Sequence, residues 1–467
     1  MSHVDRRQFL RDSALGITTI STGGIVLLDQ RVAKAAASER LRVGCVGVGG
    51  RAGFLMKAFA ARPEVDLVTL CDLDRRKLPA AIETVERITG NTPKTETDFR
   101  KLVDDPTLDA LVVGTPDHWH AIPTIMACLA GKDVYVEKPD GHNMLEGQRA
   151  VQAMRKHNRI VQMGTQSRSR SHFPSAMEYI RSGKLGKVLV VKAWESAKQG
   201  SIGRPADSRV PDGLDFDMWL GPAPKRPFNV RRFRSWEWFF DYGTGDLGND
   251  GVHRLDYARW AMSTAAEAEG GSPLQLPSKI TATGGKLFYN DMREWPDTLQ
   301  VNYEFADADG KLDRILIYEM RLWAPYKYDG EEIGATVYGD AGYLILGNSR
   351  WRAYGPGNEL VAEKARTSEG AVEHIQNFID CVKTRNKPNA DLETVGHPSS
   401  VLSHAGNIAW RLGRPLQLDP KTETFIGDDE ANALRSRPVY RKPWTLPEVW
   451  RFVKLKMTGT RRTTSGG

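Results

Sequence analysis

Hydrophobic and polar positions repeat in a regular order over the first third of the chain. Apolar runs rich in Val and Leu stand at residues 42–46, 64–72, 109–115, 133–137 and 159–164. Stretches with helical spacing of apolar residues separate them, near 54–59, 75–89, 97–104, 119–131 and 144–157. Continuous apolar runs indicate strands buried on both faces, and an intervening helix makes successive strands parallel. The pattern therefore predicts an α/β fold with a doubly wound parallel sheet.

Beyond residue 165 the pattern changes. A helix near 174–183 and a strand at 188–193 precede residues 199–235, where abundant Gly, Pro, Asp and Arg indicate a long irregular loop. A helical pattern returns at 250–262, and 278–347 contains several longer strands with alternating polarity and no helix between them. Such a series is typical of an antiparallel or mixed sheet. Helices near 370–385 and 394–412 follow, so we expect domains at 38–165 and 166–445 and a tail at 446–467.

Composition narrows the possible partners. The 467 residues suffice for two cores, and the formal net charge of +7 is small for that length. No basic tract is interleaved with aromatic residues, so we expect no nucleic-acid partner. No apolar run approaches about 18 residues, so no stable membrane span is predicted. The four cysteines and the histidines lack the spacing of a disulfide framework or a zinc site, so we expect no metal.

The first 37 residues have the composition of an export signal. Arg6-Arg7 is followed by Phe-Leu, a weakly apolar segment covers 14–28, and alanines at 33, 35 and 37 form a candidate cleavage site. These three regions resemble a twin-arginine signal, which exports proteins already folded and predicts a periplasmic location. An amphipathic N-terminal helix with a chance Arg-Arg pair is the alternative.

A glycine-rich turn follows the first strand and leads into a helix. Gly47 allows a tight turn, Gly49 lets the backbone approach a pyrophosphate, and the small Ala52 lets helix and strand pack closely. The helix N-terminus offers free N–H groups to phosphates. Asp72, at the end of the next strand, is suited to accept hydrogen bonds from ribose hydroxyls and to repel a 2′-phosphate. The cofactor expected is NAD, with NADP less favoured.

Three polar clusters follow predicted strands or loops where a doubly wound fold binds ligands. They are Gly114-Thr-Pro-Asp-His-Trp-His120, Glu137-Lys-Pro139 and Gly243-Thr-Gly-Asp-Leu-Gly-Asn-Asp-Gly-Val-His253. With the glycine turn and the Cys71-Asp72-Leu-Asp74 strand end, they make the chain resemble the Gfo/Idh/MocA oxidoreductases. This resemblance covers essentially the whole chain after the signal. It implies a Rossmann domain, an α/β domain with a large open sheet, dimers or tetramers, and nicotinamide-dependent chemistry on sugars, cyclitols or related polyols.

The resemblance also implies catalytic residues. Lys138 is expected to hydrogen-bond the reacting oxygen, and His253 to remove the hydroxyl proton. The family often has Asp four residues before this histidine, where the present chain has Asn249, with Asp250 shifted by one. An asparagine orients a hydroxyl or an imidazole but cannot take a proton, which puts the acid–base relay in doubt.

The expected site residues fall into two sets. The expected cofactor-binding residues are Gly47, Gly49, Gly50, Arg51, Ala52, Asp72, Thr115, Pro116, His120 and Glu137. The expected substrate-binding residues are Lys138, Gln166, Trp236, Trp238, Asn249, Asp250 and His253. The aromatic run at 236–240 is suited to stack on the C–H faces of a sugar, although core packing is an equal alternative.

Three functions fit these features. The first is hydride transfer between a tightly bound nicotinamide cofactor and a sugar, cyclitol or polyol. The second is glycoside cleavage through a transient keto-sugar with no net redox change, as in NAD-dependent glycosidases that resemble this family. The third is non-catalytic binding of NAD or sugar by an exported protein, because a fold does not fix a function.

Overall fold

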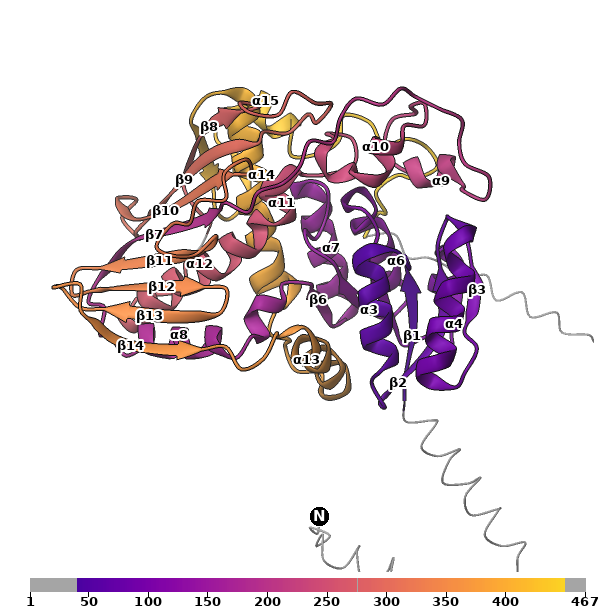
Figure 1. Cartoon of the computed structure of the whole chain (residues 1–467), viewed down its shortest axis with the longest axis horizontal. Coiled ribbons are helices and arrows are strands. Elements are labelled where there is room, and N and C mark those ends of the chain that lie inside the picture. Colours follow the sequence, from indigo (N-terminus) through magenta and orange to yellow (C-terminus); the bar gives the residue numbers. More distant parts are fainter. Residues whose placement is uncertain (1–39, 275, 450–467) are drawn as a thin grey trace, which may run out of the picture.

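A computed structural model describes residues 40–274 and 276–449. The predicted export signal at 1–37 and all of the predicted tail after residue 449 lie outside these residues. In the described part, the chain forms an N-terminal parallel sheet and a larger C-terminal sheet, joined by helices (Figure 1).

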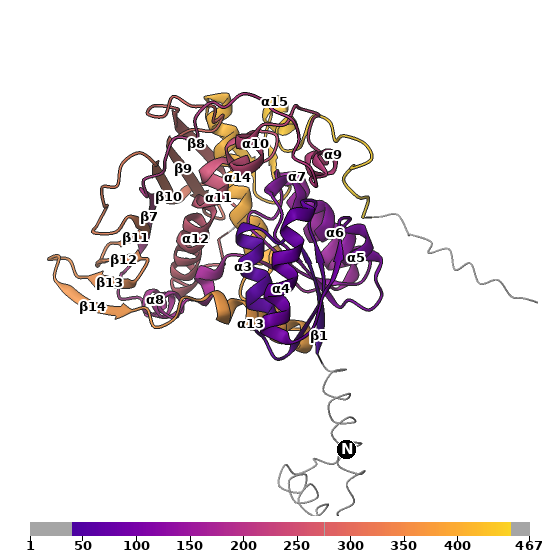
Figure 2. The same cartoon turned by 45° about the vertical axis from the view of Figure 1, so that its right-hand side comes forward.

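The N-terminal sheet has six strands in the order β3-β2-β1-β4-β5-β6, and every neighbouring pair is parallel. This confirms the predicted doubly wound parallel sheet. Figure 2 shows α3 and α4 on one face of the sheet and α5 and α6 on the other. The elements are β1 (Leu41–Val46), α3 (Gly50–Ala60), β2 (Val65–Cys71), α4 (Leu78–Thr89), β3 (Lys94–Glu96), α5 (Arg100–Asp104), β4 (Ala110–Val113), α6 (Ala121–Leu129), β5 (Asp133–Val136), α7 (Met144–His157) and β6 (Val161–Met163).

The C-terminal sheet has ten strands in the order β14-β13-β12-β11-β7-β10-β9-β8-β15-β16. Only the β7–β10 pair is parallel among its described pairs, so the expected large and mostly antiparallel sheet is confirmed. Its strands are β7 (Val188–Glu195), β8 (Lys279–Gly285), β9 (Thr298–Ala306), β10 (Leu312–Arg321), β11 (Ile333–Gly339), β12 (Tyr343–Gly347), β13 (Arg350–Tyr354), β14 (Leu360–Ala365), β15 (Leu416–Asp419) and β16 (Thr424–Phe425).

Helices cover one face of this sheet. They are α8 (His172–Arg181), α12 (Gly251–Ala268) and α14 (His397–Leu412), which pack on β13, on β7 and on β8 respectively. The short α11 (Gly245–Asn249) precedes α12, and α15 (Asp429–Ala433) follows β16. Inward-facing residues of the central strands, such as Leu316, Tyr318 and Val301, are completely buried under these helices.

Several elements differ from the sequence predictions. Two short helices, α9 (Phe216–Leu220) and α10 (Val230–Arg234), lie within the segment predicted to be irregular. Each has an N-cap side chain, Asp215 and Asn229, which accepts a hydrogen bond from the first turn. Five residues are too few to show a helical period in the sequence. The strands β3, β13 and β14 were also not predicted, since β3 and β14 consist mostly of exposed positions.

The chain returns to the N-terminal sheet after β14. Helix α13 (Ala371–Thr384) packs beside α3, and the Phe378 ring lies 6.0 Å from that of Phe59 and 5.9 Å from that of Tyr135. The sheets are therefore joined by a segment that contributes apolar side chains to the N-terminal core.

Candidate active site

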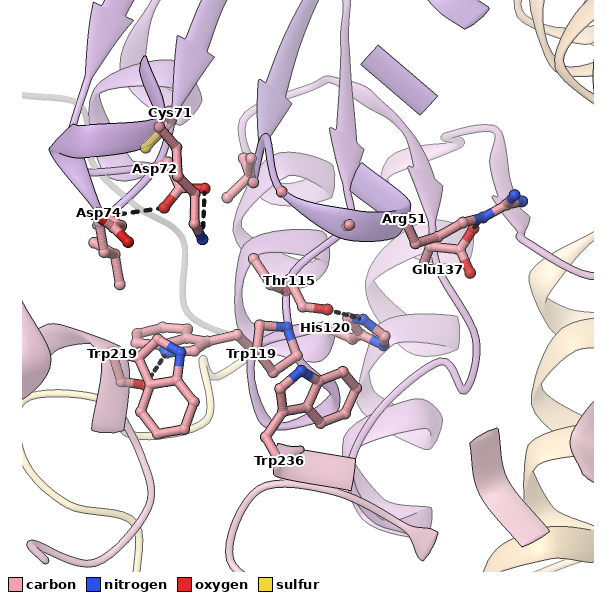
Figure 3. Close-up of a pocket in the computed structure, with 18 of the residues that line it drawn as sticks. Arg51, Cys71, Asp72, Asp74, Thr115, Trp119, His120, Glu137, Trp219 and Trp236 are labelled. Carbon is pink, nitrogen blue, oxygen red and sulfur yellow. Dashed lines mark hydrogen bonds and ion pairs between the residues drawn. The ribbon is translucent and has the colours of Figure 1, made fainter. Parts of the chain in front are cut away.

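A cavity of about 470 Å³ opens at the carboxyl ends of β1, β2, β4 and β5 (Figure 3). Residues from the N-terminal sheet form one wall, and the segment from 218 to 249 supplies the other. The carboxyl edge of a doubly wound sheet is where such folds bind ligands. Of the residues expected in the site, the cavity wall includes Gly47, Gly49, Gly50, Arg51, Asp72, Thr115, Pro116, His120, Glu137, Lys138, Trp236 and Asn249.

The glycine turn packs closely against the neighbouring strand end at Gly47. Gly47 has φ of +95°, and a Cβ on it would lie 3.1 Å from the carbonyl oxygen of Gly114. A Cβ on Gly114 would in turn lie 2.7 Å from that of Ala52, so this close approach needs small residues on both sides. Helix α3 begins directly after Gly49, which provides no side-chain cap. Its first N–H groups therefore remain available to a phosphate, and the turn fits a dinucleotide.

Asp72 is held in place by the backbone around it. Its Oδ2 accepts a hydrogen bond from the Val48 amide at 3.1 Å, and its Oδ1 accepts one from the Asp74 amide at 2.9 Å. The neighbouring Arg76 is paired through two hydrogen bonds with Asp74, which leaves its guanidinium less able to bind a 2′-phosphate. Lys77 Nζ lies 3.7 Å from Asp72 Oδ2. This arrangement fits a ribose with free hydroxyls.

Arg51 and Glu137 form an ion pair across the cavity wall, with 2.7 Å between Nε and Oε1 (Figure 3). Gln166 Oε1 also accepts a weaker bond from the Arg51 guanidinium at 3.4 Å. These three predicted site residues therefore bind one another. Glu137 fixes Arg51 beside the N-terminus of α3, where positive charge and free amides favour an anion.

The histidines after β4 have different environments. His120 lines the cavity and joins two loops, since its ring nitrogens lie 2.6 Å from the Pro139 carbonyl oxygen and 2.7 Å from that of Thr115. His118 instead lies behind the wall, with Nε2 at 2.8 Å from the Trp219 carbonyl oxygen. Burial lowers the pKa of His118 to about 3, so this imidazole is neutral and holds the loop in place.

Lys138 and Asn249 bring the two parts of the chain together. Lys138 Nζ donates a hydrogen bond to the Asn249 main-chain oxygen at 2.7 Å and another to its Oδ1. Both residues line the cavity, one following β5 and the other ending α11. The ammonium group is therefore directed toward the cavity by an asparagine 111 residues further along the chain.

His253 lies in the first turn of α12, four residues after Asn249. Only 7% of its surface is exposed, and its Nδ1 has no hydrogen-bond partner among the described residues. Burial lowers the pKa of this imidazole well below 6.5, and the charges of Lys138 and Arg254 lower it further. The imidazole is therefore neutral, and each such ring has one nitrogen able to accept a proton.

The remaining expected residues lie deeper or to one side. Trp238 is 3% exposed, and the Arg293 guanidinium stacks on its ring at 4.4 Å. Trp236 lines the cavity, whereas five other predicted site residues do not: Ala52, Gln166, Trp238, Asp250 and His253. Asp250 precedes α12 as its N-cap residue, and its main-chain oxygen accepts a bond from the His253 amide.

Sequence reasoning missed Glu237, which lies between the two tryptophans. Burial raises the pKa of its carboxyl group to about 7, with Asp117 and Asp250 raising it further and Lys138 opposing them. A carboxyl group that titrates near neutral pH beside a proposed catalytic lysine is typical of a functional site. The sequence around Glu237 shows only that it lies between two aromatic residues. It does not show the burial and the nearby charges that raise the pKa of its carboxyl group.

Residues 40–274 and 276–449 contain no group of three or more side chains placed to hold a metal ion. They also contain no helix with the length and apolar character needed to cross a membrane.

Comparisons with known proteins agree with this geometry. A family model of the Gfo/Idh/MocA oxidoreductases, described as an NAD-binding Rossmann fold, matches residues 41–165. A second model, for the C-terminal α/β domain of the same oxidoreductases, matches residues 188–283 and 359–446.

Individual relatives show the same likeness. The chain is 24% identical over 403 residues to scyllo-inositol 2-dehydrogenase (NAD(+)) of Bacillus subtilis, covering 81% of this chain and 97% of that protein. It is 30% identical to a glycosyl hydrolase family 109 protein of Saccharopolyspora erythraea, over 39% of this chain and 44% of that one. The fold is similar to aldose-aldose oxidoreductase of Caulobacter crescentus, with a TM-score of 0.60 and 20% identity, covering 81% of this chain and all of that one.

Proposed function

Because the chain belongs to the Gfo/Idh/MocA oxidoreductase family and has its NAD-binding Rossmann domain, we propose that it transfers hydride between NAD and a CH–OH group of a sugar, cyclitol or related polyol. The observation that carries this proposal is the contact of Lys138 with Asn249 at the cavity where the glycine turn ends. The similarity to an inositol dehydrogenase, over 81% of this chain, supports this substrate class.

Different residues of the cavity would hold the different parts of the NAD molecule. The amides that begin α3 would hold the pyrophosphate, Asp72 the adenosine ribose, and the Thr115 and His120 region the nicotinamide half. When bound, the nicotinamide supplies a hydride acceptor or donor. The glycine turn and the fixed Asp72 carboxylate are already shaped for this group, so binding requires little rearrangement.

Lys138 and His253 have separate tasks in the proposed reaction. The Lys138 ammonium donates a hydrogen bond to the reacting oxygen and stabilises negative charge that develops there. The neutral His253, whose Nδ1 has no hydrogen-bond partner among the described residues, takes the hydroxyl proton. Asn249 cannot accept a proton, so its role is to direct Lys138 and a substrate hydroxyl.

We also propose that the protein is exported folded to the periplasm with NAD tightly bound, and that it forms a homo-oligomer. The Arg6-Arg7 signal pattern supports export, and the family resemblance supports oligomers. The periplasm has no free nicotinamide dinucleotide pool, so a cofactor acquired before export has to stay bound. Denaturing the purified protein should release NAD.

An isotope experiment tests the reaction itself. Candidate sugars, cyclitols and glycosides deuterated at the reacting carbon are incubated with the NAD-loaded protein. A keto product and transfer of the label to the cofactor support the proposal. A hydrolysed glycoside with NAD unchanged indicates the redox-neutral reaction, and the absence of any turnover over a broad substrate panel indicates a binding protein.

Substitution of the two proposed catalytic residues tests their roles. Lys138→Ala and His253→Ala should each lower kcat by about 10²–10⁴-fold, the usual effect of losing a positioned proton-transfer group. NAD should remain bound in both variants. The double variant should lose far less than the product of the two effects, since residues that act on one step are non-additive. Near-normal turnover by either variant would exclude the role given to that residue.

A further inference from the structure

A second cavity, of about 400 Å³, lies apart from the cofactor cavity and shares no lining residue with it. Its walls come from α14, from residues 142–143 and 240–244, and from the segment 434–439. Trp236 faces the first cavity while Phe240 and Thr244 face the second, so residues 236–244 contribute to both. The second cavity is therefore distinct from the cofactor cavity.

One face of α14 lines this cavity, mostly with polar and charged side chains. His404, Asn407, Ile408 and Arg411 line it, at the i, i+3, i+4 and i+7 positions that share one side of a helix. Asn407 is fixed there, since its Nδ2 donates a 2.7 Å hydrogen bond to the Thr244 carbonyl oxygen. The face is thus held in place by its own contacts.

Several buried polar atoms in these walls have no partner among the described residues. They are His404 Nε2, Asn407 Oδ1 and Arg437 Nη2, and the side chains that carry them are at most 9% exposed. His142 Nδ1 is a fourth. Buried polar groups are almost always hydrogen-bonded, because an unpaired one is destabilising. Four of them around one cavity are hydrogen-bonding groups available to a polar ligand.

The charge on the walls is positive. Arg411 and Arg437 both line the cavity, and Arg437 Nη1 is held by the Asp241 carbonyl oxygen at 2.8 Å. The only wall carboxylate among the described residues, that of Asp241, is paired with Arg226. Arg437 is itself ion-paired with the buried Glu146, with 3.5 Å between Nε and Oε1, so Arg411 is the wall cation for which the described residues provide no ion pair. An unpaired guanidinium group favours an anion, because its planar fork binds carboxylates and phosphates through two hydrogen bonds.

Aromatic rings and imidazoles complete the cavity. Phe240 and Trp295 pack edge to face with 4.5 Å between ring centroids, and the Arg411 guanidinium lies 4.8 Å from the Phe240 ring. Burial lowers the pKa of His404 to about 4, so its imidazole is a neutral hydrogen-bonding group suited to hydroxyls. Aromatic walls with a few converging polar groups are typical of small-molecule sites.

We propose that this second cavity binds a sugar-sized organic anion, which carries a carboxylate or phosphate beside several hydroxyl groups. Arg411 binds its charge, and the unpaired Nη2 of Arg437 donates a further hydrogen bond to it. His142, His404 and Asn407 bind its hydroxyls, and Phe240 and Trp295 cover its C–H face. The site is separate from the proposed site of hydride transfer and does not depend on that reaction.

Calorimetric titration of the full-length, NAD-loaded protein tests the proposal with four probes: glucuronate, glucose 6-phosphate, glucose and inorganic phosphate. Saturable binding of glucuronate or glucose 6-phosphate, at least tenfold tighter than that of glucose and of phosphate, is expected. Binding of glucuronate but not of glucose 6-phosphate identifies a carboxylate site, and the reverse identifies a phosphate site. Equal binding of glucose, equal binding of inorganic phosphate, or no binding of either organic anion would overturn the proposal.

Matched variants locate the binding. Arg411→Gln should weaken binding of the organic anion by about 10–100-fold, the usual effect of losing a charged hydrogen bond. Arg414→Gln is the control, because Arg414 follows the same helix, pairs with Asp428 and does not line the cavity. Lys138→Ala should leave this binding unchanged. If Lys138→Ala weakens it and Arg411→Gln does not, the anion binds at the other cavity and the proposal fails.

Discussion

Asp72 shows how one side chain can serve both the turn and the cofactor. Its two oxygens accept bonds from the Val48 and Asp74 amides, so the carboxylate is fixed before any ribose arrives. Asp72→Ala should weaken NAD binding by about 10–100-fold, because a charged hydrogen bond and a support of the glycine turn disappear together. The preference for NAD over NADP should fall as well, since the repulsion of a 2′-phosphate is lost. Equilibrium titration with both cofactors measures each effect.

The control for Asp72 lies on β2, the strand that ends directly before it. Asp66 pairs with Arg42 at 3.0 Å on the half-exposed side of β2 and does not line the cofactor cavity. Asp66→Ala should leave the affinity for both cofactors unchanged. Unaltered NAD and NADP affinities in Asp72→Ala would show that ribose recognition resides elsewhere.

Glu237 is expected to determine the pH dependence of the reaction. Its pKa is raised to about 7, chiefly by burial, so it is mostly protonated at pH 6 and mostly ionised at pH 8. The negative charge of ionised Glu237, beside Lys138, increases the proton affinity of His253, the group proposed to take the substrate proton. Alcohol oxidation should therefore rise through a midpoint near pH 7, and Glu237→Gln should flatten this part of the kcat/KM profile.

His253 serves as the comparison for that profile. Its pKa is held well below 6.5 by burial, so its own titration should not contribute between pH 6 and pH 8. A step near pH 7 that persists in Glu237→Gln would contradict the assignment to Glu237.

Between elements, a buried charge network ties α14 to the loop that follows β5. His397, in the first turn of α14, contacts Asp140 through Nδ1 at 2.7 Å and Glu423 through Nε2 at 2.9 Å. Asp140 follows Lys138 by two residues, so this network fixes the loop that presents the lysine. The two carboxylates outweigh the effect of burial and raise the pKa of His397 to about 10, so the imidazole is charged in the folded protein.

His397→Gln should lower the free energy of unfolding by about 3–5 kcal/mol near pH 7, because it leaves buried carboxylates without their cation. The raised pKa sets the pH dependence in the wild type. The stabilisation that charged His397 gives the folded protein is fully present below about pH 6.5. It declines as this histidine loses its proton in the unfolded chain, and it is lost as pH rises through about 10. Urea unfolding at several pH values measures both.

A surface ion pair provides the control for His397. Arg155 and Glu393 pair with side chains 58% and 29% exposed, so Arg155→Gln should cost less than about 1 kcal/mol and show no such pH window. A His397→Gln variant as stable as the wild type at pH 7 would show that the network contributes nothing.

The elements also show what the sequence could predict. The central parallel strands β1, β4 and β5 are almost entirely buried and mostly apolar, and the glycine turn and Asp72 are local in sequence, so pattern alone located them. Strand β14 is exposed along its length and has no hydrophobic alternation to reveal it. The Lys138–Asn249 contact and the environment of Glu237 depend on folding of distant segments. The family resemblance placed Lys138 and Asn249 in one site but did not predict the hydrogen bonds between them.

At the scale of the whole molecule, the N-terminal sheet is completed by residues that come more than 200 positions later. Ile375, Phe378 and Ile379 of α13 are almost fully buried against one face of this sheet, beside Phe59 and Tyr135. Leu392, Trp444 and Val449 join the core on the opposite face. The cofactor-binding part of the chain therefore depends on the C-terminal part for its packing.

This dependence predicts that a fragment of residues 40–165 does not form a stable domain alone. Without α13, the face around Phe59 and Tyr135 is left exposed, and the loss of several buried side chains exceeds the stability of about 5–15 kcal/mol typical of whole proteins. The fragment should lack the sharp urea transition and near-ultraviolet circular dichroism of the full-length protein. In the full-length protein, Phe378→Ala should cost about 3–5 kcal/mol, whereas Val372→Ala, on the exposed side of the same helix, should cost less than about 0.5 kcal/mol. A fragment that unfolds cooperatively, with native circular dichroism and NAD affinity, would show that the N-terminal sheet is independent of the helix that covers it.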